Sequence, residues 1–199
     1  MVSGPTKPRA VLIGPPGSGK STIGRRLAKE LGVSWHDTDE AVAAGAGSSI
    51  SDIFVDHGEA HFRDLERAEV AAALSRDGVV SLGGGAPMDP ATQAALAGHT
   101  VVFLDVGIAD AARRVGFDAS RPLLMVNPRA TWTKMMTERR PTYERLATHR
   151  VDTAGRKLAA VVAEIVELLE RRGEPEDPSE GRARPGAPTS ATDELEGQP

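Results

Sequence analysis

The stretch "VLIGPPGSGKST", Val11 to Thr22, decides the fold of the chain around it. Three apolar residues lead into a loop with three glycines and two prolines, and a lysine and two hydroxyl side chains follow. Residues Gly14 to Ser21 match the pattern G-x-x-x-x-G-K-[ST], in which a loop between a strand and a helix wraps its backbone N–H groups around phosphate. We therefore predict a strand, a nucleotide-binding loop and a helix.

Each residue type in this loop suits the binding of a nucleotide. Glycine permits the turns that bring N–H groups to phosphate oxygens, and the helix adds the positive end of its dipole. Lys20 would reach the β- and γ-phosphates, and the Ser21 hydroxyl would be a ligand of Mg²⁺. A glycine-rich turn that binds nothing is the alternative, but the full pattern arises by chance in only roughly one chain in a hundred of this size. The predicted ATP-binding residues of the loop are Gly17, Ser18, Gly19, Lys20, Ser21 and Thr22.

The composition limits the class of protein. The chain has 199 residues, 40% of them hydrophobic, which suffices for one compact domain with a tail. Of its 28 acidic and 24 basic residues, 7 acidic and 2 basic ones lie in 173–199, so 21 acidic and 22 basic residues remain and the body has no basic surplus for nucleic acid. The absence of cysteine excludes disulfides and thiolate metal sites. Because no long apolar segment precedes the loop, we expect a cytoplasmic protein.

Hydrophobic runs alternate with helical patterns along the chain. The runs, rich in β-branched residues, occupy 10–13, 34–36, 79–82, 100–106 and 150–153. Helical patterns lie between them, and the last one covers 158–170. This alternation predicts an α/β fold with a five-stranded parallel sheet flanked by helices.

The end of the chain has a different composition. Residues 173–199 contain five prolines, one leucine and no aromatic residue. Such a segment buries too little apolar surface to offset the entropy lost on ordering. We therefore predict one domain over 1–172 and a disordered, acidic, proline-rich tail over 173–199.

Two carboxylates follow the second predicted strand, in "SWHDTDEAV". Asp37 and Asp39 would lie at the carboxyl end of that strand, where an open parallel sheet binds its ligands. In an extended segment they point to the same side, so that one could hold Mg²⁺ and the other could accept a proton from a hydroxyl. The alternative is that Asp39 caps the next helix. Beside a phosphate-binding loop, we favour the functional interpretation.

Two further segments have loop compositions that suit contact with a ligand. Gly83, Gly84 and Gly85 end the third predicted strand, and glycines there allow backbone to lie against a small molecule. A flexible turn is the alternative. Residues 116–127, "GFDASRPLLMVN", are typical of a lid that folds over ATP, with a plain surface loop as the alternative.

Six separated motifs together resemble the shikimate kinase family. The phosphate loop is followed by "DTD", by "FR" at 62–63 with Glu66, by "SLGGG", by "RPLL" at 121–124 and by "RRPTY" at 139–143. The resemblance covers residues from about 8 to 171. It implies the nucleoside-monophosphate-kinase-like fold and the ATP-dependent phosphorylation of the 3-hydroxyl of shikimate, with Mg²⁺ as cofactor.

The resemblance implies roles on the nucleotide side of the site. It assigns Ser21 and Asp37 to Mg²⁺ and places Arg114 on the adenine ring. Relatives often carry a proline on the opposite side of that ring, where this chain has Leu158. Arg121 resembles the lid arginine that approaches the phosphates. The catalytic residues that the resemblance implies are Lys20, Asp39 at the reacting hydroxyl, and Arg121.

Shikimate is a small polyol carboxylate, so its site needs guanidinium donors, a hydroxyl acceptor and an apolar wall. The resemblance assigns Asp39 to the reacting hydroxyl and Arg63, Gly84, Gly85 and Arg139 to the substrate. Gly83 of the same glycine run is predicted to bind the substrate as well, and Pro16, Phe54 and Phe62 would suit the apolar wall. Arg63 has an ordinary alternative, because Glu59 and Glu66 lie one helical turn away and could pair with it at the surface. Arg140 is an alternative to Arg139 as the substrate-binding arginine, although the pattern R-x-P-x-Y favours Arg139.

Other classes of protein fit less well. A kinase for gluconate or a nucleoside monophosphate should recognise the substrate that accepts the phosphoryl group with residues other than the DTD, FR and GGG set. A GTP-hydrolysing switch needs D-x-x-G soon after the loop and also N-K-x-D, whereas "DTAG" comes only at 152–155 and N-K-x-D is absent. The spacing of His57 and His61 lacks the glutamate position of a zinc motif. We expect a monomer that binds shikimate and ATP, with no nucleic acid and no membrane.

Overall fold

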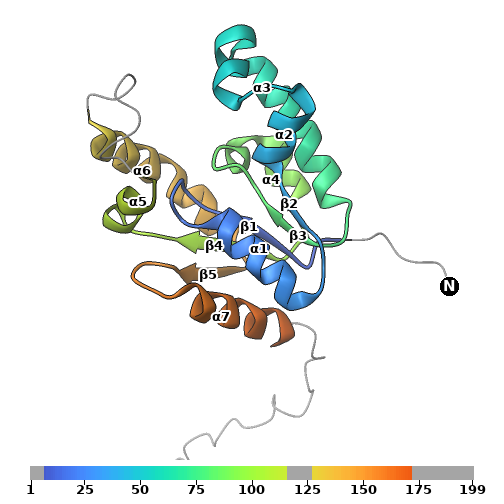
Figure 1. Cartoon of the computed structure of the whole chain (residues 1–199), viewed down its shortest axis with the longest axis vertical. Helices are drawn as coiled ribbons and strands as arrows, with labels where there is room; N and C mark the ends of the chain where they lie inside the picture. The colour runs from blue at the N-terminus through green and yellow to red at the C-terminus, as the bar shows by residue number, and fades with distance from the viewer. Residues whose placement is uncertain (1–6, 116–126, 172–199) are drawn as a thin grey trace, which may run out of the picture.

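The computed structural model describes residues 7–115 and 127–171 (Figure 1). Arg121, most of the predicted lid and the predicted tail lie outside the described residues. None of the helices within these ranges is long and apolar enough to cross a membrane. The elements are β1 (Ala10–Ile13), α1 (Lys20–Leu31), β2 (Trp35–Asp37), α2 (Thr38–Ala46), α3 (Ile50–Leu74), β3 (Val79–Ser81), the 3-10 turn η1 (Ala86–Met88), α4 (Pro90–Ala95), β4 (Val101–Asp105), α5 (Ile108–Val115), α6 (Pro128–Leu146), β5 (His149–Asp152) and α7 (Leu158–Arg171).

The sheet has five parallel strands in the order β2-β3-β1-β4-β5. Leu12 of the central strand β1 pairs with Ser81 of β3 on one side and with Val102 of β4 on the other. Because helices cover both faces of such a sheet, β1 is apolar and fully buried. The predicted α/β fold with a five-stranded parallel sheet is confirmed, and the strand ends differ from the predicted ones by one residue at most.

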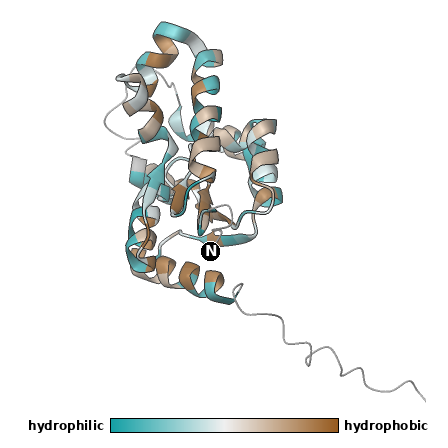
Figure 2. Cartoon of the chain, turned by 90° about the vertical axis from the view of Figure 1, so that its right-hand side faces the viewer, coloured by the Kyte–Doolittle hydropathy of each residue, from teal (hydrophilic) through white to brown (hydrophobic). Residues whose placement is uncertain are grey.

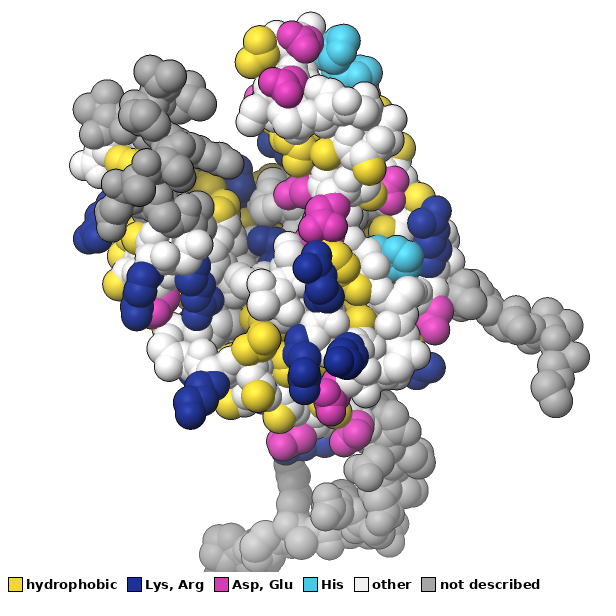
Figure 3. Space-filling model, viewed as in Figure 1, with side chains coloured by type: hydrophobic (Ala, Val, Ile, Leu, Met, Phe, Trp, Pro, Cys, Tyr) yellow, Lys and Arg dark blue, Asp and Glu magenta, His cyan; other side chains and the backbone are white. Residues whose placement is uncertain are grey.

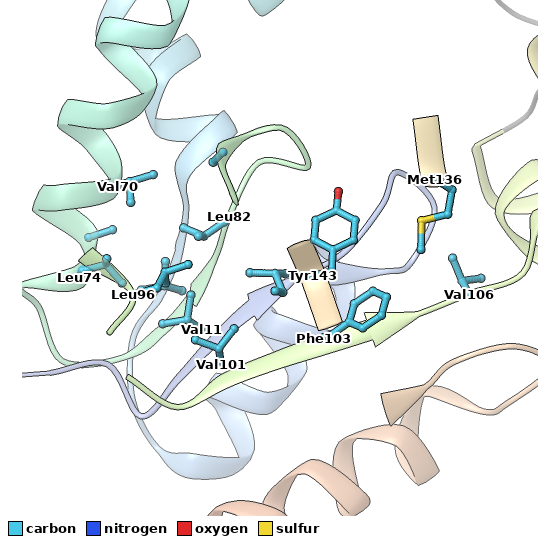
Figure 4. Close-up of a cluster of buried hydrophobic side chains, with 14 of the residues drawn as sticks. Val11, Val70, Leu74, Leu82, Leu96, Val101, Phe103, Val106, Met136 and Tyr143 are labelled. Carbon is cyan, nitrogen blue, oxygen red and sulfur yellow. The ribbon is translucent and has the colours of Figure 1, made fainter. Parts of the chain in front are cut away.

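Alternate residues of β1 face opposite sides of the sheet, and each side meets its own helices. Leu12 lies in a core cluster with side chains of α1 and α7. Val11 lies in the opposite cluster with side chains of α3 and α6, where the ring of Tyr143 stacks on that of Phe103 at a centroid distance of 5.3 Å (Figure 4). The hydrophobic residues accordingly concentrate on the strands at the centre of the molecule (Figure 2).

The helices α2 and α3 pack against each other and project beyond the sheet (Figure 1). The helix that the capping alternative placed after Asp39 is α2, which begins at Thr38, directly after β2. Asp37 caps this helix, because its carboxylate accepts hydrogen bonds from the N–H groups of Asp39 at 3.0 Å and Glu40 at 3.3 Å. The alternative that Asp39 is the cap is therefore wrong, and the Asp39 carboxylate is available for other contacts.

Candidate active site

The glycine-rich loop turns sharply from β1 into α1. Gly17 has a φ of +84°, and a Cβ atom there would lie 2.8 Å from the Cα atom of Ala111 in α5. Only glycine fits at this position. Because α1 begins at Lys20, the N-terminus of the helix faces the loop, as the binding of phosphate requires.

Lys20 folds back over the loop that precedes it. Its Nζ atom donates hydrogen bonds to the carbonyl oxygens of Gly14 at 2.8 Å and Pro15 at 3.2 Å. Burial lowers the pKa of Lys20 to about 8, against the opposing effect of the Asp39 and Asp37 charges. The ammonium group thus lies in the loop with two replaceable carbonyl partners, so an anionic ligand can recruit it.

Ser21 and Asp37 place two oxygen ligands side by side. The Ser21 hydroxyl donates to Oδ2 of Asp37 at 2.7 Å, while Oδ1 of the same carboxylate caps α2. No group of three or more histidine, aspartate or glutamate side chains in the described part of the chain could hold a metal ion. One hydroxyl and one carboxylate beside a phosphate loop suit Mg²⁺, which keeps several waters and takes its remaining ligands from phosphates.

The Asp39 carboxyl group has a pKa well above its ordinary value. Burial raises its pKa to about 6, and the charge of Asp37 adds to this effect. Lys20 and, more weakly, Arg63 act in the opposite direction. Its Oδ1 atom lies against Gly83, where a side chain would collide with it. A carboxyl group with a pKa near the working pH is suited to accept a proton during catalysis.

Arg63 forms the ion pairs that the sequence suggested as an alternative. It also lies at the glycine loop that follows β3, Gly83 to Gly85, which we call the acceptor loop. Its guanidinium donates to Glu66 at 2.6 Å and to Glu59 at 3.1 Å. The partner Glu66 is buried, with 3% of its surface exposed, so this pair holds the guanidinium in one place. A Cβ atom on Gly85 would lie 2.7 Å from Nη1 of Arg63, which explains the glycine there.

The two adjacent arginines of α6 point to different partners. Arg139 donates to the carbonyl oxygen of Gly84 at 3.2 Å, so it lies at the acceptor loop. Arg140 makes two hydrogen bonds to Asp105, at 2.7 and 2.9 Å. Burial alone would raise the pKa of Asp105, but hydrogen bonds from Arg140 and Arg150 outweigh it and lower that pKa. The geometry favours Arg139 for the site and gives Arg140 a structural partner.

The predicted apolar wall is divided between a buried and a half-exposed ring. Phe62 is 4% exposed and packs with Val42 and Ile53 between α2 and α3. Phe54 is 36% exposed, and the two ring centroids are 4.7 Å apart. Arg63 lies over the Phe62 ring at 5.3 Å, so this ring also supports the guanidinium.

A cavity of about 520 Å³ opens beside the phosphate loop. Figure 3 shows the molecule hollowed on this face, between the α2–α3 pair and the side of the molecule that carries α5 and α6. Asp37 and Asp39 line the cavity together with loop residues 16–22, except Ser18. Sequence reasoning missed Thr153 and Arg156, which also line it. Both follow the last strand at the carboxyl edge of the sheet, and that position is the signal that could have identified them.

Arg114 and Leu158 both line this cavity, where the resemblance places the adenine ring. Arg114 donates to the carbonyl oxygens of Gly17 at 3.2 Å and Thr153 at 2.6 Å, so it connects α5 with the loop and with the end of β5. Leu158 leaves 39% of its surface exposed. An apolar side chain therefore stands at the position where relatives often have proline.

Comparison with known proteins identifies relatives across most of the chain. The model of a family described as shikimate kinase matches residues 16–170. A shikimate kinase from Salinispora arenicola is 56% identical over 163 residues, which cover 81% of this chain and 98% of the relative. One from Mycobacterium tuberculosis is 53% identical over 165 residues, which cover 82% of this chain and 94% of the relative.

Solved structures are similar in fold. The shikimate kinase from Acinetobacter baumannii in complex with shikimate has a TM-score of 0.75 and 28% identity, covering 84% of this chain and 94% of the other. The shikimate kinase from Aquifex aeolicus has a TM-score of 0.71 and 32% identity, covering 82% and 97%. Both similarities therefore cover more than four fifths of this chain.

Proposed function

The chain belongs to the shikimate kinase family, and from this premise we propose how its residues phosphorylate shikimate. The reaction transfers the γ-phosphoryl group of ATP to the 3-hydroxyl of shikimate and yields shikimate 3-phosphate and ADP. The observation that carries the proposal is the position of Asp39, which lines the same cavity as Lys20 and has its Oδ1 atom against Gly83. The Arg63 guanidinium lies at Gly85 of the same glycine loop, so a proton acceptor lies near a cation of the phosphate loop and a cation of α3.

The acceptor side of the site recognises a carboxylate and a hydroxyl. Arg63 and Arg139 lie at neighbouring glycines of the acceptor loop, Gly85 and Gly84. Forked guanidinium groups suit the carboxylate of shikimate, and Asp39 suits its reacting hydroxyl. All of these residues come from one chain, so the site needs no second subunit, and we propose that the protein acts as a monomer.

The nucleotide side of the site adjoins the acceptor side. A Cβ atom on Gly84 would lie 3.5 Å from both the Gly14 carbonyl oxygen and the Pro16 side chain, so the acceptor loop lies against the phosphate loop. ATP binds with its phosphates at the N-terminus of α1 and its base between Arg114 and Leu158. Ser21 and Asp37 would hold Mg²⁺, which would neutralise charge on the phosphates.

Phosphoryl transfer depends on positioning and charge stabilisation. Lys20 exchanges its two carbonyl partners for the phosphate oxygens. The 3-hydroxyl oxygen forms a bond to the γ-phosphorus, the bond from that phosphorus to the bridging oxygen of ADP breaks, and the hydroxyl proton passes to Asp39.

An assay of ADP release with several acceptors tests the assignment. We expect turnover with shikimate and a kcat/KM lower by roughly a thousandfold or more with gluconate, nucleoside monophosphates or water, because these acceptors do not place a carboxylate and a hydroxyl as the ring of shikimate does and so leave polar groups of the site unpaired. Phosphorus NMR of the product should place the phosphoryl group on the 3-oxygen. Faster turnover with gluconate or a nucleotide than with shikimate would refute the assignment.

Asp37→Asn should raise the Mg²⁺ concentration needed for half-maximal activity severalfold, because a neutral amide is a weaker ligand of the ion. Asparagine still caps α2, so the fold should persist. Excess Mg²⁺ should restore part of the activity. The matched variant Asp39→Asn should not respond, since it lacks the proton acceptor. If Mg²⁺ restores both variants equally, the division of roles between the two carboxylates is wrong.

A further inference from the structure

Five successive backbone carbonyl groups of the phosphate loop have side-chain donors. From Gly14 to Ser18, each carbonyl oxygen accepts at least one hydrogen bond from a lysine, an arginine or a tryptophan. The pairs are Lys20 with Gly14 and Pro15, Trp132 with Pro16, and Arg114 with Gly17 and Ser18. The outward direction of these carbonyl groups is therefore held by residues of three helices.

The direction of the Pro16 carbonyl is coupled to the direction of the N–H group that follows it. That carbonyl and the N–H of Gly17 belong to one planar trans peptide, so they point in opposite directions. Gly17 has a φ of +84° and no side chain, so its own conformational preference leaves the plane free to turn. A donor on the Pro16 carbonyl consequently sets the direction of the Gly17 N–H, one of the groups that meet phosphate.

Trp132 supplies this donor from α6. Its Nε1 atom lies 3.1 Å from the Pro16 oxygen, and its ring is 7% exposed in the core cluster that includes Met136. It is not one of the described residues that line the cavity. We propose that Trp132 is a positioning residue of the phosphate loop, acting through the hydrogen bond from its indole N–H to the Pro16 carbonyl.

This role rests in one respect on the proposed function. When Lys20 moves to the phosphates of ATP, the loop loses the donor to its first two carbonyl groups. The donors that remain come from α5 and α6. Arg114, the donor from α5, lines the cavity and contacts the nucleotide. Trp132 is then the donor whose place is set by core packing alone.

The helix that carries Trp132 also contacts the acceptor loop. Arg139 and Tyr143 follow Trp132 by seven and eleven residues, a spacing that keeps them on the same side of α6. Both donate to the carbonyl oxygen of Gly84, at 3.2 Å and 2.6 Å. One helix thus sets the distance between the two loops that hold the reactants.

Trp132→Phe tests the role, because phenylalanine keeps most of the ring packing and removes the N–H. Titration calorimetry should show Mg-ADP binding weakened roughly three- to tenfold, the usual range for one lost neutral hydrogen bond. The affinity for AMP, which has no β-phosphate, and for shikimate alone should stay within about twofold of the parent. Unchanged affinity for Mg-ADP, or an equal loss for all three ligands, would overturn the role.

Met136→Ala is the matched control for packing. Met136 lies one turn further along α6, in the same core cluster, and is 5% exposed. This variant should lower the melting temperature by several degrees and leave the affinity for Mg-ADP unchanged. Binding assays also separate the positioning role of Trp132 from the proposed function. If the parent protein binds Mg-ADP but does not phosphorylate shikimate, only the proposed function is contradicted.

A second substitution removes the N–H with almost no change of shape. The chain has two tryptophans, so in a Trp35→Phe background a tryptophan analogue with sulfur in place of the ring N–H can be placed at position 132 alone. We expect the same selective loss for Mg-ADP when the analogue protein is compared with the tryptophan protein in that background. Equal affinities in this pair would overturn the role even if Trp132→Phe did not fold.

Discussion

Asp39→Asn should make the protein more stable at pH 7 and lower kcat for shikimate by roughly a hundredfold to ten-thousandfold, the usual contribution of a positioned acid or base. The gain in stability follows from the pKa of Asp39, which burial raises from 3.8 to about 6. Between these values the folded state retains a proton that the unfolded state has lost, so the free energy of unfolding decreases as pH rises through this window. Above about pH 6 the full penalty applies, on the order of 1 to 3 kcal/mol.

Thermal unfolding of the parent and Asp39→Asn at pH 4 and pH 7 measures this penalty. The melting temperature of the variant should exceed that of the parent at pH 7, and the difference should shrink toward pH 4, where the parent carboxyl is also neutral. Binding of Mg-ADP provides the control for an intact phosphate loop. A variant that is less stable at pH 7, or that keeps its kcat, would contradict the role of Asp39.

Arg139→Ala and Arg140→Ala should separate binding from stability at adjacent positions. Arg139→Ala removes a charge-assisted partner of the substrate carboxylate, so kcat/KM for shikimate should fall roughly ten- to a hundredfold or more while nucleotide affinity stays near normal. Arg140→Ala leaves the buried carboxylate of Asp105 with Arg150 as its remaining ion-pair partner in the described structure. This change should lower the free energy of unfolding by about 1 to 3 kcal/mol and leave the KM for shikimate nearly unchanged.

The pair of variants serves as its own control, because both remove an arginine from the same turn of α6. Steady-state kinetics with each substrate varied in turn, together with urea unfolding, gives the two quantities for each variant. A large increase in the KM for shikimate in Arg140→Ala, with normal kinetics in Arg139→Ala, would reverse the assignment. Comparable losses in both would mean that α6 as a whole, and not one guanidinium, positions the substrate.

The phosphate loop could be predicted from sequence because its function depends on local chemistry. Glycines at turns, an apolar strand before them and a lysine at the start of the helix act over a dozen consecutive residues, so the pattern from Val11 to Thr22 contains the whole unit. The positions of the buried strands β1, β3 and β4 were predictable for the same reason, since a buried parallel strand is a short, mostly apolar run. Family resemblance then assigned Asp39 and Arg139 to the acceptor.

Local sequence features did not decide which aspartate caps α2. Both Asp37 and Asp39 are good helix caps, and the sequence does not say where β2 ends and the helix begins. The structure decides for Asp37, because the strand extends to this residue through its pairing with Ser81 of β3. That long-range pairing leaves the carboxylate of Asp39 at the acceptor loop.

The sequence by itself determined the α/β class, the phosphate loop and the family resemblance, because each depends on residues that are neighbours in the chain or on ordered motifs. Only the tertiary structure decided the strand order, the different partners of Arg139 and Arg140, and the contact of Trp132 with Pro16. These features join residues 35 to 116 positions apart. Their geometry follows from how helices pack on the sheet, and no local pattern of residue types encodes that packing.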